Sequence, residues 1–152
     1  MINLPTQQCP LCDGPLVERD TPSEIHLGNR RATVHDRYHE CEACGEQLYA
    51  PGQMAETQML ASDKIRDEEG LLRSSRIHSI RTELGLTQQQ FEQLLGVGPK
   101  TVVRWEKGTV FQNRATDSLI RLVAEVPGVA AHLAQRHGVE IASQPTDLAS
   151  AE

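Results

Sequence analysis

The sequence predicts an α+β protein of two domains: a small β-rich N-terminal domain with one helix, then an all-α domain of five helices. Three observations predict this division. The first 50 residues form short alternating or broken segments and contain both Cys-x-x-Cys pairs of the chain. From residue 72 onward, apolar residues recur at helical spacing instead. The charges divide in the same way, with a net −7 over 1–70, +4 over 71–138 and −3 over 139–152.

The domain boundaries follow from composition. We assign 1–66 to the first domain, 67–71 to a charged linker closed by glycine, and 72–138 to the second domain. The tail 139–152 is small, polar and proline-containing, so we expect it to be disordered. The chain has neither an 18-residue apolar run nor a secretory signal, which predicts a cytoplasmic protein with reduced cysteines and no membrane partner.

Strands and one helix are expected in the first domain. The segments 15–19 and 23–29 are short and broken by Pro and Gly, and LGNR (27–30) is a plausible turn. Segment 31–40 alternates apolar and polar residues, as a strand with one buried face does. That face carries Ala32, Val34 and Tyr38. A helix is expected from about Gly52 to Glu68.

The second domain begins with two helices separated by glycine. The first ends at Gly85, and TQQQ (87–90) is a capping box that begins the second, which ends at Gly96. The apolar residues expected inside these helices are Ile77, Ile80, Leu84, Phe91, Leu94 and Leu95.

Three further helices are expected. The third follows the turn GVG (96–98), has Pro99 at its first helical position and ends at Gly108. The fourth runs from about Arg114 to Val126 and the fifth over 129–137. The residues expected to be buried are Val102 and Trp105 in the third helix, and Leu119, Leu122, Val123 and Val126 in the fourth.

All four cysteines lie in two pairs, CPLCDG (9–14) and CEACGE (41–46), with 28 residues between the pairs. Two intervening residues let a tight turn present both sulfurs to one metal, and Gly14 and Gly45 stand where such a turn needs a positive φ. Four thiolates suit Zn²⁺ in a closed tetrahedral site. We therefore predict one structural Zn²⁺ per chain. Its ligands are Cys9, Cys12, Cys41 and Cys44.

Other interpretations of the cysteines remain open. They could be unliganded structural thiols, a redox pair, or ligands of an iron–sulfur cluster, although no thioredoxin-like pattern surrounds either pair. The histidines between the pairs could also be ligands, but are more often surface or strand residues. They are His26, His35 and His39. A catalytic zinc deaminase would need a His-x-Glu element before its cysteines, and the chain has none.

The second and third helices of this domain, joined by a short glycine-containing turn, form a helix-turn-helix arrangement. In that arrangement the early residues of the later helix enter the major groove of DNA. Lys100, Thr101, Val103 and Arg104 lie off the Val102/Trp105 face. Arg104 can bind guanine O6 and N7, and Lys100 a base or phosphate. The residues suited to phosphate contacts are Thr101, Gln88, Lys107 and Arg114. The alternative is an ordinary helical bundle whose basic residues keep it in solution.

Residues 76–126 resemble the Xre/Cro-type helix-turn-helix family, and LTQQQFEQLLGVGPKTVVRWEKG carries the match. Together with both cysteine pairs, residues 9–137 resemble the MqsA (YgiT-type) antitoxins. The resemblance implies a zinc domain that binds a toxin and a helix-turn-helix domain that dimerises and represses the operon. It assigns zinc ligation to the four cysteines and base reading to Arg104. Lys100 stands where a better-known member has asparagine, so a different operator sequence is expected.

The resulting hypothesis is an antitoxin of a type II toxin-antitoxin system, without catalysis of its own. Its acidic zinc domain would neutralise a cognate toxin, by family analogy an RNA-cleaving one, and a homodimer would repress its operon on a palindromic double-stranded DNA operator. One alternative is a stand-alone zinc-containing Xre-family regulator with a different or no protein partner. An enzyme is the other alternative, but no catalytic triad, phosphate loop or open metal site supports it.

Overall fold

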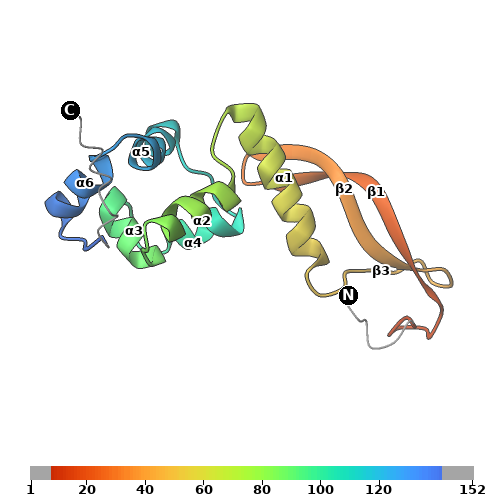
Figure 1. Ribbon diagram of the computed structural model, residues 1–152. Coiled ribbons are helices and arrows are strands. Elements are labelled where there is room, and N and C mark those ends of the chain that lie inside the picture. Colours follow the sequence, from red (N-terminus) through yellow and green to blue (C-terminus); the bar gives the residue numbers. More distant parts are fainter. Residues whose placement is uncertain (1–7, 142–152) are drawn as a thin grey trace, which may run out of the picture. The chain divides into compact units, whose positions relative to one another are not determined.

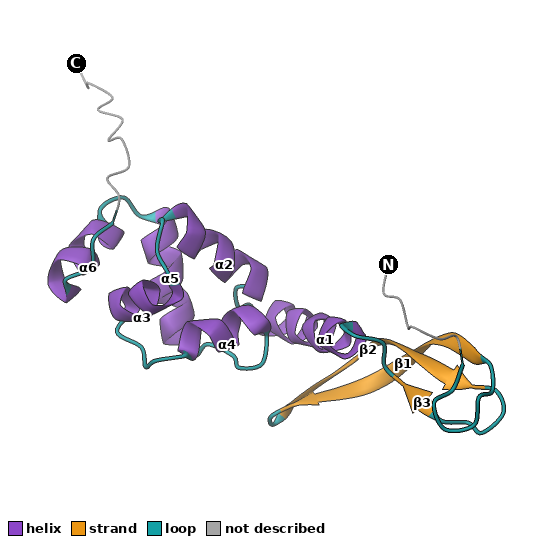
Figure 2. Cartoon of the chain, turned by 90° about the horizontal axis from the view of Figure 1, so that it is seen from below, coloured by secondary structure: helices purple, strands orange, loops and turns teal. Residues whose placement is uncertain are grey.

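The computed structural model describes residues 8–141 (Figure 1). The chain divides into two compact units, Met1–Gly70 and Leu71–Glu152. Among the described residues, the first unit contains a three-stranded antiparallel sheet and one helix, and the second contains five helices. Figure 2 shows that the strands and the helical unit are separate parts of the chain, so the predicted α+β class is confirmed. Across 8–141, no helix combines the length and apolarity that a membrane crossing requires.

One long hairpin dominates the N-terminal unit. Strands β1 (Leu16–Leu27) and β2 (Arg30–Cys41) pair antiparallel along their whole length. The two-residue turn between them has Gly28 at φ +64°, a conformation that glycine adopts without strain. The short strand β3 (Gln47–Leu48) pairs with the end of β2, so β1 is an edge strand of this sheet.

The expectation of two short segments, 15–19 and 23–29, is wrong, because one continuous strand covers both. Pro22, which favoured a break, lies within β1 opposite His35. A proline has no N–H to donate, but alternate N–H groups of an edge strand point away from its only neighbour. The edge position therefore lets β1 continue through Pro22.

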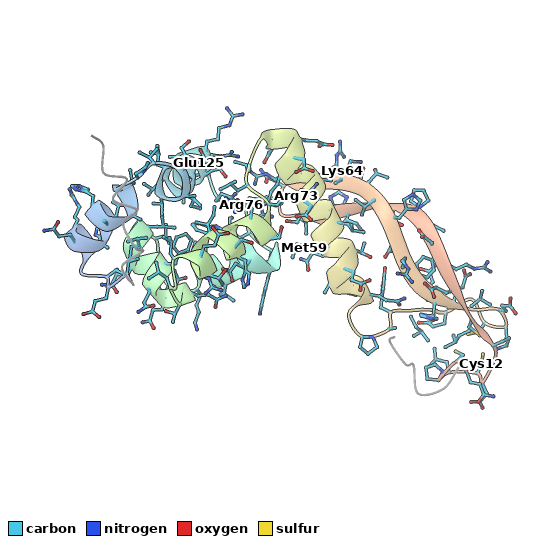
Figure 3. The ribbon with its side chains drawn as sticks, in the orientation of Figure 1. Cys12, Met59, Lys64, Arg73, Arg76 and Glu125 are labelled. Atoms are coloured by element: carbon cyan, nitrogen blue, oxygen red, sulfur yellow. The ribbon has the colours of Figure 1, made fainter. Side chains whose placement is uncertain are left out.

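Helix α1 (Gln53–Glu69) lies along the hairpin and packs mainly on β2 (Figure 1). The predicted alternation of β2 is confirmed: its sheltered face carries Ala32, Val34, Asp36 and Tyr38. The helix buries Thr57, Ala61 and Ile65, which are spaced four residues apart on one face. Lys64, labelled in Figure 3, donates a hydrogen bond to the Thr33 carbonyl at 2.8 Å.

The helix expected from about Gly52 to Glu68 is confirmed, and residues 67–69, which composition assigned to a linker, belong to it. The charged run has no apolar periodicity, but a solvent-facing last turn needs none, and glutamate favours helix. The helix ends at Gly70, whose φ of +71° lets its N–H bond to the carbonyls of Arg66 and Asp67.

The C-terminal unit comprises α2 (Ser74–Glu83), α3 (Gln88–Leu95), α4 (Thr101–Lys107), α5 (Arg114–Glu125) and α6 (Val129–His137). The predicted capping box at the start of α3 is confirmed. The Thr87 hydroxyl accepts from the Gln90 N–H at 3.1 Å, and the Gln90 side chain accepts from the Thr87 N–H at 2.9 Å. The predicted residues that lie buried in one shared core include Ile77, Ile80, Phe91, Leu94, Leu95, Val102 and Trp105.

Two residues expected inside the fourth helix lie outside the core. Leu122 is 47% exposed and Val126 43%, whereas Ile120 is fully buried and takes their place beside Val123. Helix α5 carries apolar residues on more than one face, so their spacing fits two orientations of the helix equally well. Packing against the other helices decides between them.

The predicted tail, 139–152, begins too early. Val139 is buried in the core, and Ile141 packs against it. Gly138 ends α6 at φ +68°, and the Val139 N–H bonds to the Ala134 carbonyl at 2.9 Å, so the chain folds back onto the helix that it leaves. Residues 142–152, to which the rest of the disorder prediction applies, lie outside the described residues.

Candidate metal centre and DNA-reading helix

The two cysteine pairs meet beyond the end of the hairpin opposite its turn, where Figure 3 labels Cys12. All four sulfurs lie within 4.8 Å of one another. The Cys9 and Cys44 sulfurs are 3.8 Å apart, and those of Cys12 and Cys41 are 3.4 Å apart. Sulfurs at the corners of a tetrahedron with metal bonds of about 2.3 Å lie about 3.8 Å from one another. The predicted cysteines thus come together, and this donor set could bind one metal ion.

The two cysteine turns share one backbone geometry. The Asp13 N–H donates to the Cys9 carbonyl, and the Gly45 N–H donates to the Cys41 carbonyl, both at 2.9 Å. In each turn, the residue after the second cysteine has a positive φ: +59° at Asp13 and +76° at Gly45. This repeated turn aims the two sulfurs of each pair in the same direction.

The prediction for Gly45 is confirmed, but that for Gly14 is wrong, because Asp13 supplies the positive φ in the first turn. Aspartate is one of the few non-glycine residues that enter this region with modest strain. Gly14 is needed for space instead. A Cβ there would lie 2.7 Å from the Ala43 Cβ and 2.9 Å from the Cys41 sulfur, closer than real Cβ contacts.

Hydrogen bonds among the cysteines and from the backbone shift the pKa values of the thiols. The Cys44 backbone N–H, 3.5 Å from the Cys41 sulfur, lowers the pKa of Cys41 to about 7 against the effect of burial. The Gly14 backbone lowers the pKa of Cys12, but hydrogen bonds with Cys41 and Cys44 outweigh it and raise this pKa to about 12. A bound dication would displace the thiol protons, because its ligands are thiolates.

The histidines between the cysteine pairs have other partners. His26 contacts Glu24, His35 contacts Asp20, and His39 contacts Gln53. Among the described residues, the group of potential metal ligands contains the four cysteines and no histidine.

Substituting Gly14→Ala is expected to weaken metal binding by about 10- to 100-fold, the loss typical when groups supporting metal ligands are disturbed. The added Cβ must displace either Ala43 or the Cys41 sulfur. Competition with a chromogenic chelator measures the affinity. Gly28→Ala is the control for an added methyl group, because its Cβ would meet no atom within 4 Å, although Gly28, unlike Gly14, has a positive φ that alanine adopts only with strain. Equal affinities for the two variants would contradict the assigned role of Gly14.

The turn before α4 differs from the prediction. The Thr101 N–H bonds to the Gly98 carbonyl at 3.4 Å, and Lys100 has φ +67° and ψ 3°. These are the features of a type II turn with Pro99 in its second position. Pro99 therefore precedes α4, and the expectation that it opens the helix is wrong. Proline is favoured both at the first position of a helix and at the second position of a turn, and the φ of the next residue distinguishes the two cases.

A buried carboxylate fixes the start of α4 against α3. Glu92 is 7% exposed, and its side chain accepts a hydrogen bond from the Val102 N–H at 3.0 Å. The first N–H groups of a helix have no partner within it, and negative charge is favoured there. Glu92 was not among the residues predicted from the sequence. The available signal was its place on the flank of the apolar face of α3, next to Phe91.

Glu106 connects α4 to α2 and α3. It accepts from Arg81 at 2.6 Å and from Gln88 at 2.7 Å. Burial raises the pKa of Glu106, but hydrogen bonds from Arg81, Gln88 and His78 outweigh it and lower this pKa below its ordinary value. Gln88, predicted to contact phosphate, therefore also has a structural partner.

The other predicted DNA contacts surround the outer side of this helix pair. Lys100, Arg104 and Lys107 are exposed, and Thr101 and Val103 are half-buried. Gln88, Lys100 and Val103 help to line a depression of about 290 Å³ between α3 and α4. Arg114 is exposed at the first position of α5, apart from this depression. The α4 residues Val102 and Trp105 are buried, as predicted.

A family model described as the antitoxin component of a bacterial toxin-antitoxin system, MqsA, matches residues 7–133. The match spans both cysteine pairs and all of α3 and α4. No curated protein matches the chain.

Proposed function

Because the chain belongs to the MqsA antitoxin family, we propose that it is the antitoxin of a type II toxin-antitoxin system, acting in the cytoplasm as a regulator without catalysis. Its N-terminal unit neutralises a cognate toxin, and its C-terminal unit represses the operon that encodes both proteins. The observation that carries this proposal is the family match over residues 7–133, because it covers the cysteine cluster and the α3–α4 pair together.

We propose Zn²⁺ as the ion of the cysteine cluster. The sulfur separations of 3.4 and 3.8 Å are close to the edge of about 3.8 Å expected for tetrahedral zinc thiolate. Four protein ligands leave no position for a substrate, so the role of the ion is structural. The ligands are Cys9, Cys12, Cys41 and Cys44.

We propose that α3 and α4 form a helix-turn-helix in which α4 enters the major groove of double-stranded DNA. The exposure of Lys100 and Arg104 and the net charge of +4 over 71–138 support this. Arg104 reads a guanine, and Lys100, Thr101 and Val103 line the same surface. The phosphate contacts are Gln88, Lys107 and Arg114.

Arg104→Ala is expected to cost about 1–3 kcal/mol on the operator and to relax preference at one base pair per half-site. Lys107→Ala should weaken binding to all DNA sequences equally, because a phosphate contact mainly releases counterions. It should also lower the slope of the logarithm of the binding constant against the logarithm of the salt concentration by about one unit per site. Binding titrations at two salt concentrations, on the operator and on scrambled DNA, separate the two effects. Unchanged operator binding by Arg104→Ala would exclude α4 as the reading helix.

We also propose a homodimer through α5 and α6, which would match a palindromic operator. The exposed Leu122 of α5 and Val126, which follows the last residue of α5, support this seam. Leu122→Glu is expected to give a monomer at micromolar concentration and weaker operator binding, because a carboxylate would be buried without a partner. Sedimentation velocity measures the oligomeric state. Ser75→Glu, at an exposed polar position of α2 outside the proposed seam, should remain dimeric; a dimeric Leu122→Glu would place the seam elsewhere.

The proposed function is tested by expressing the chain with the product of the neighbouring gene. The full chain should restore growth, co-purify with that product, and bind the DNA upstream of the gene pair. The Cys41→Ser variant should lose the protein complex and keep DNA binding, since only the N-terminal unit depends on the metal. The proposal fails if the full chain forms neither complex.

A further inference from the structure

The N-terminal unit contains a pocket that the cysteine cluster does not use. It has a volume of about 210 Å³ and lies between the turn end of the hairpin and the first half of α1. Ile25, Leu27 and Met54 give it apolar walls, and Asp36, which belongs to the strand on which α1 packs, also lines it. A cavity of about 150 Å³ is enough to bind benzene. The pocket can therefore hold a planar group with part of an aliphatic chain.

Asp36 is unusual in this pocket because it carries a carboxylate and is only 6% exposed. Its carboxylate accepts hydrogen bonds from the Tyr49 hydroxyl at 2.7 Å and from the Thr57 hydroxyl at 3.0 Å. Within residues 8–141, no lysine or arginine forms an ion pair with it. A carboxylate has about four acceptor positions, so about two remain for a ligand.

Tyr49 is held by the same side chain. The hydrogen bond to Asp36, together with burial, raises the pKa of Tyr49 above its ordinary value. A buried carboxylate without a cation is costly, and neutral hydroxyl donors offset only part of that cost. A cation supplied by a ligand would complete the site.

Three features select the guanidinium group of arginine as that cation. Its planar array of N–H donors matches a carboxylate, whereas the ammonium of lysine is compact and strongly hydrated. Its methylene stem can pack on Ile25 and Met54. Its flat face can stack on the Tyr49 ring, which is 41% exposed and held edge-on by Tyr38 at a centroid distance of 6.3 Å.

We propose that this pocket binds an arginine side chain of a basic protein partner, with Asp36 as the anchoring carboxylate. The net −7 over residues 1–70 attracts a basic protein and repels nucleic acid. The pocket turns that general attraction into a contact with one side chain. The identification of the partner with the cognate toxin rests on the proposed function, but the arginine specificity of the pocket does not.

The test uses the isotope-labelled full chain with its metal bound, and Nα-acetyl-arginine N-methylamide as the probe. We expect saturable NMR shifts confined to amides around the pocket, with a dissociation constant on the order of millimolar, as for a small fragment. The citrulline derivative has the same shape without the charge. The citrulline derivative should bind at least about tenfold more weakly, because it cannot form the charge-assisted hydrogen bonds.

Two variants and one control variant locate the site. Asp36→Asn should weaken arginine binding about tenfold or more, while Glu56→Gln, which removes the same charge from α1 outside the pocket lining, should not change it. Gln58→Lys keeps Asp36 and adds a competing cation to the pocket lining. It should also block the probe, and it decides the result if Asp36→Asn does not fold.

Equal binding of arginine and citrulline would overturn the proposal. So would unchanged binding in folded Asp36→Asn or in Gln58→Lys, or an equal loss in Glu56→Gln. No toxin takes part in the measurement, so the two proposals fail separately. If the chain binds arginine but no toxin, the antitoxin proposal fails and the pocket proposal stands. If the chain binds a toxin but the pocket does not respond to arginine, only the pocket proposal fails.

Discussion

Removing the metal from the intact chain is expected to unfold residues 9–50 and to leave the helices of the C-terminal unit folded. The N-terminal unit has few buried apolar side chains besides its cysteines: Leu27, Ala32, Ala50, Ala61 and Ile65. Structural zinc binding supplies about 10–16 kcal/mol at neutral pH, more than so thin a core can replace. The C-terminal unit has its own core and no cysteine, so the ion does not stabilise it.

Amide NMR spectra before and after chelation would show this separation, since only resonances of the first unit should collapse. Cys41→Ser should reproduce the loss, and His39→Ala should retain the ion because His39 lies outside the sulfur cluster. Metal analysis of the chain purified without added metal should give one equivalent of zinc. An iron chromophore, or full metal content in Cys41→Ser, would contradict the proposed site.

Trp105→Ala is expected to destabilise the C-terminal unit by about 3–5 kcal/mol. The indole is 3% exposed and belongs to the core shared by all five helices. Small domains are stable by only about 5–15 kcal/mol, so this loss would shift the unfolding transition strongly. Circular dichroism is used to follow unfolding, because the substitution removes the only tryptophan of the chain and therefore its fluorescence signal.

Lys107→Ala is the control for Trp105→Ala, because Lys107 is exposed two residues further along the same helix. Its free energy of unfolding should stay within about 0.5 kcal/mol of the parent. If Trp105→Ala instead melted like the parent and lost DNA affinity, the indole would be a contact residue and the assigned faces of α4 would be wrong.

The features that the sequence predicted well depend on short spacings. Two residues between cysteines define a turn that presents both sulfurs, and Thr87 and Gln90 form a capping box within a single helical turn. The residue order alone therefore predicts the cysteine cluster and the start of α3.

The features that it missed depend on partners distant in the chain. Pro22 continues a strand only because β1 lies at the sheet edge, and Leu122 is exposed only because the other helices pack on Ile120. Gly14 is required by Ala43 and Cys41, which lie about thirty residues away. Asp36 and Glu92 lie on or beside faces that are otherwise apolar, but their burial could not be predicted, because the hydroxyl and amide donors that hold their carboxylates come from other elements.

The carboxylate cap of Glu92 has an evolutionary consequence for α4. Glu92 and Trp105 hold this helix from its buried side, so neighbouring exposed residues can change without altering its orientation. If α4 reads DNA as proposed, relatives could therefore differ in the DNA sequence that they recognise by substituting exposed positions such as 104 on a constant scaffold. Position 100 is less open to drift, since its φ of +67° favours glycine, asparagine and aspartate over other residues.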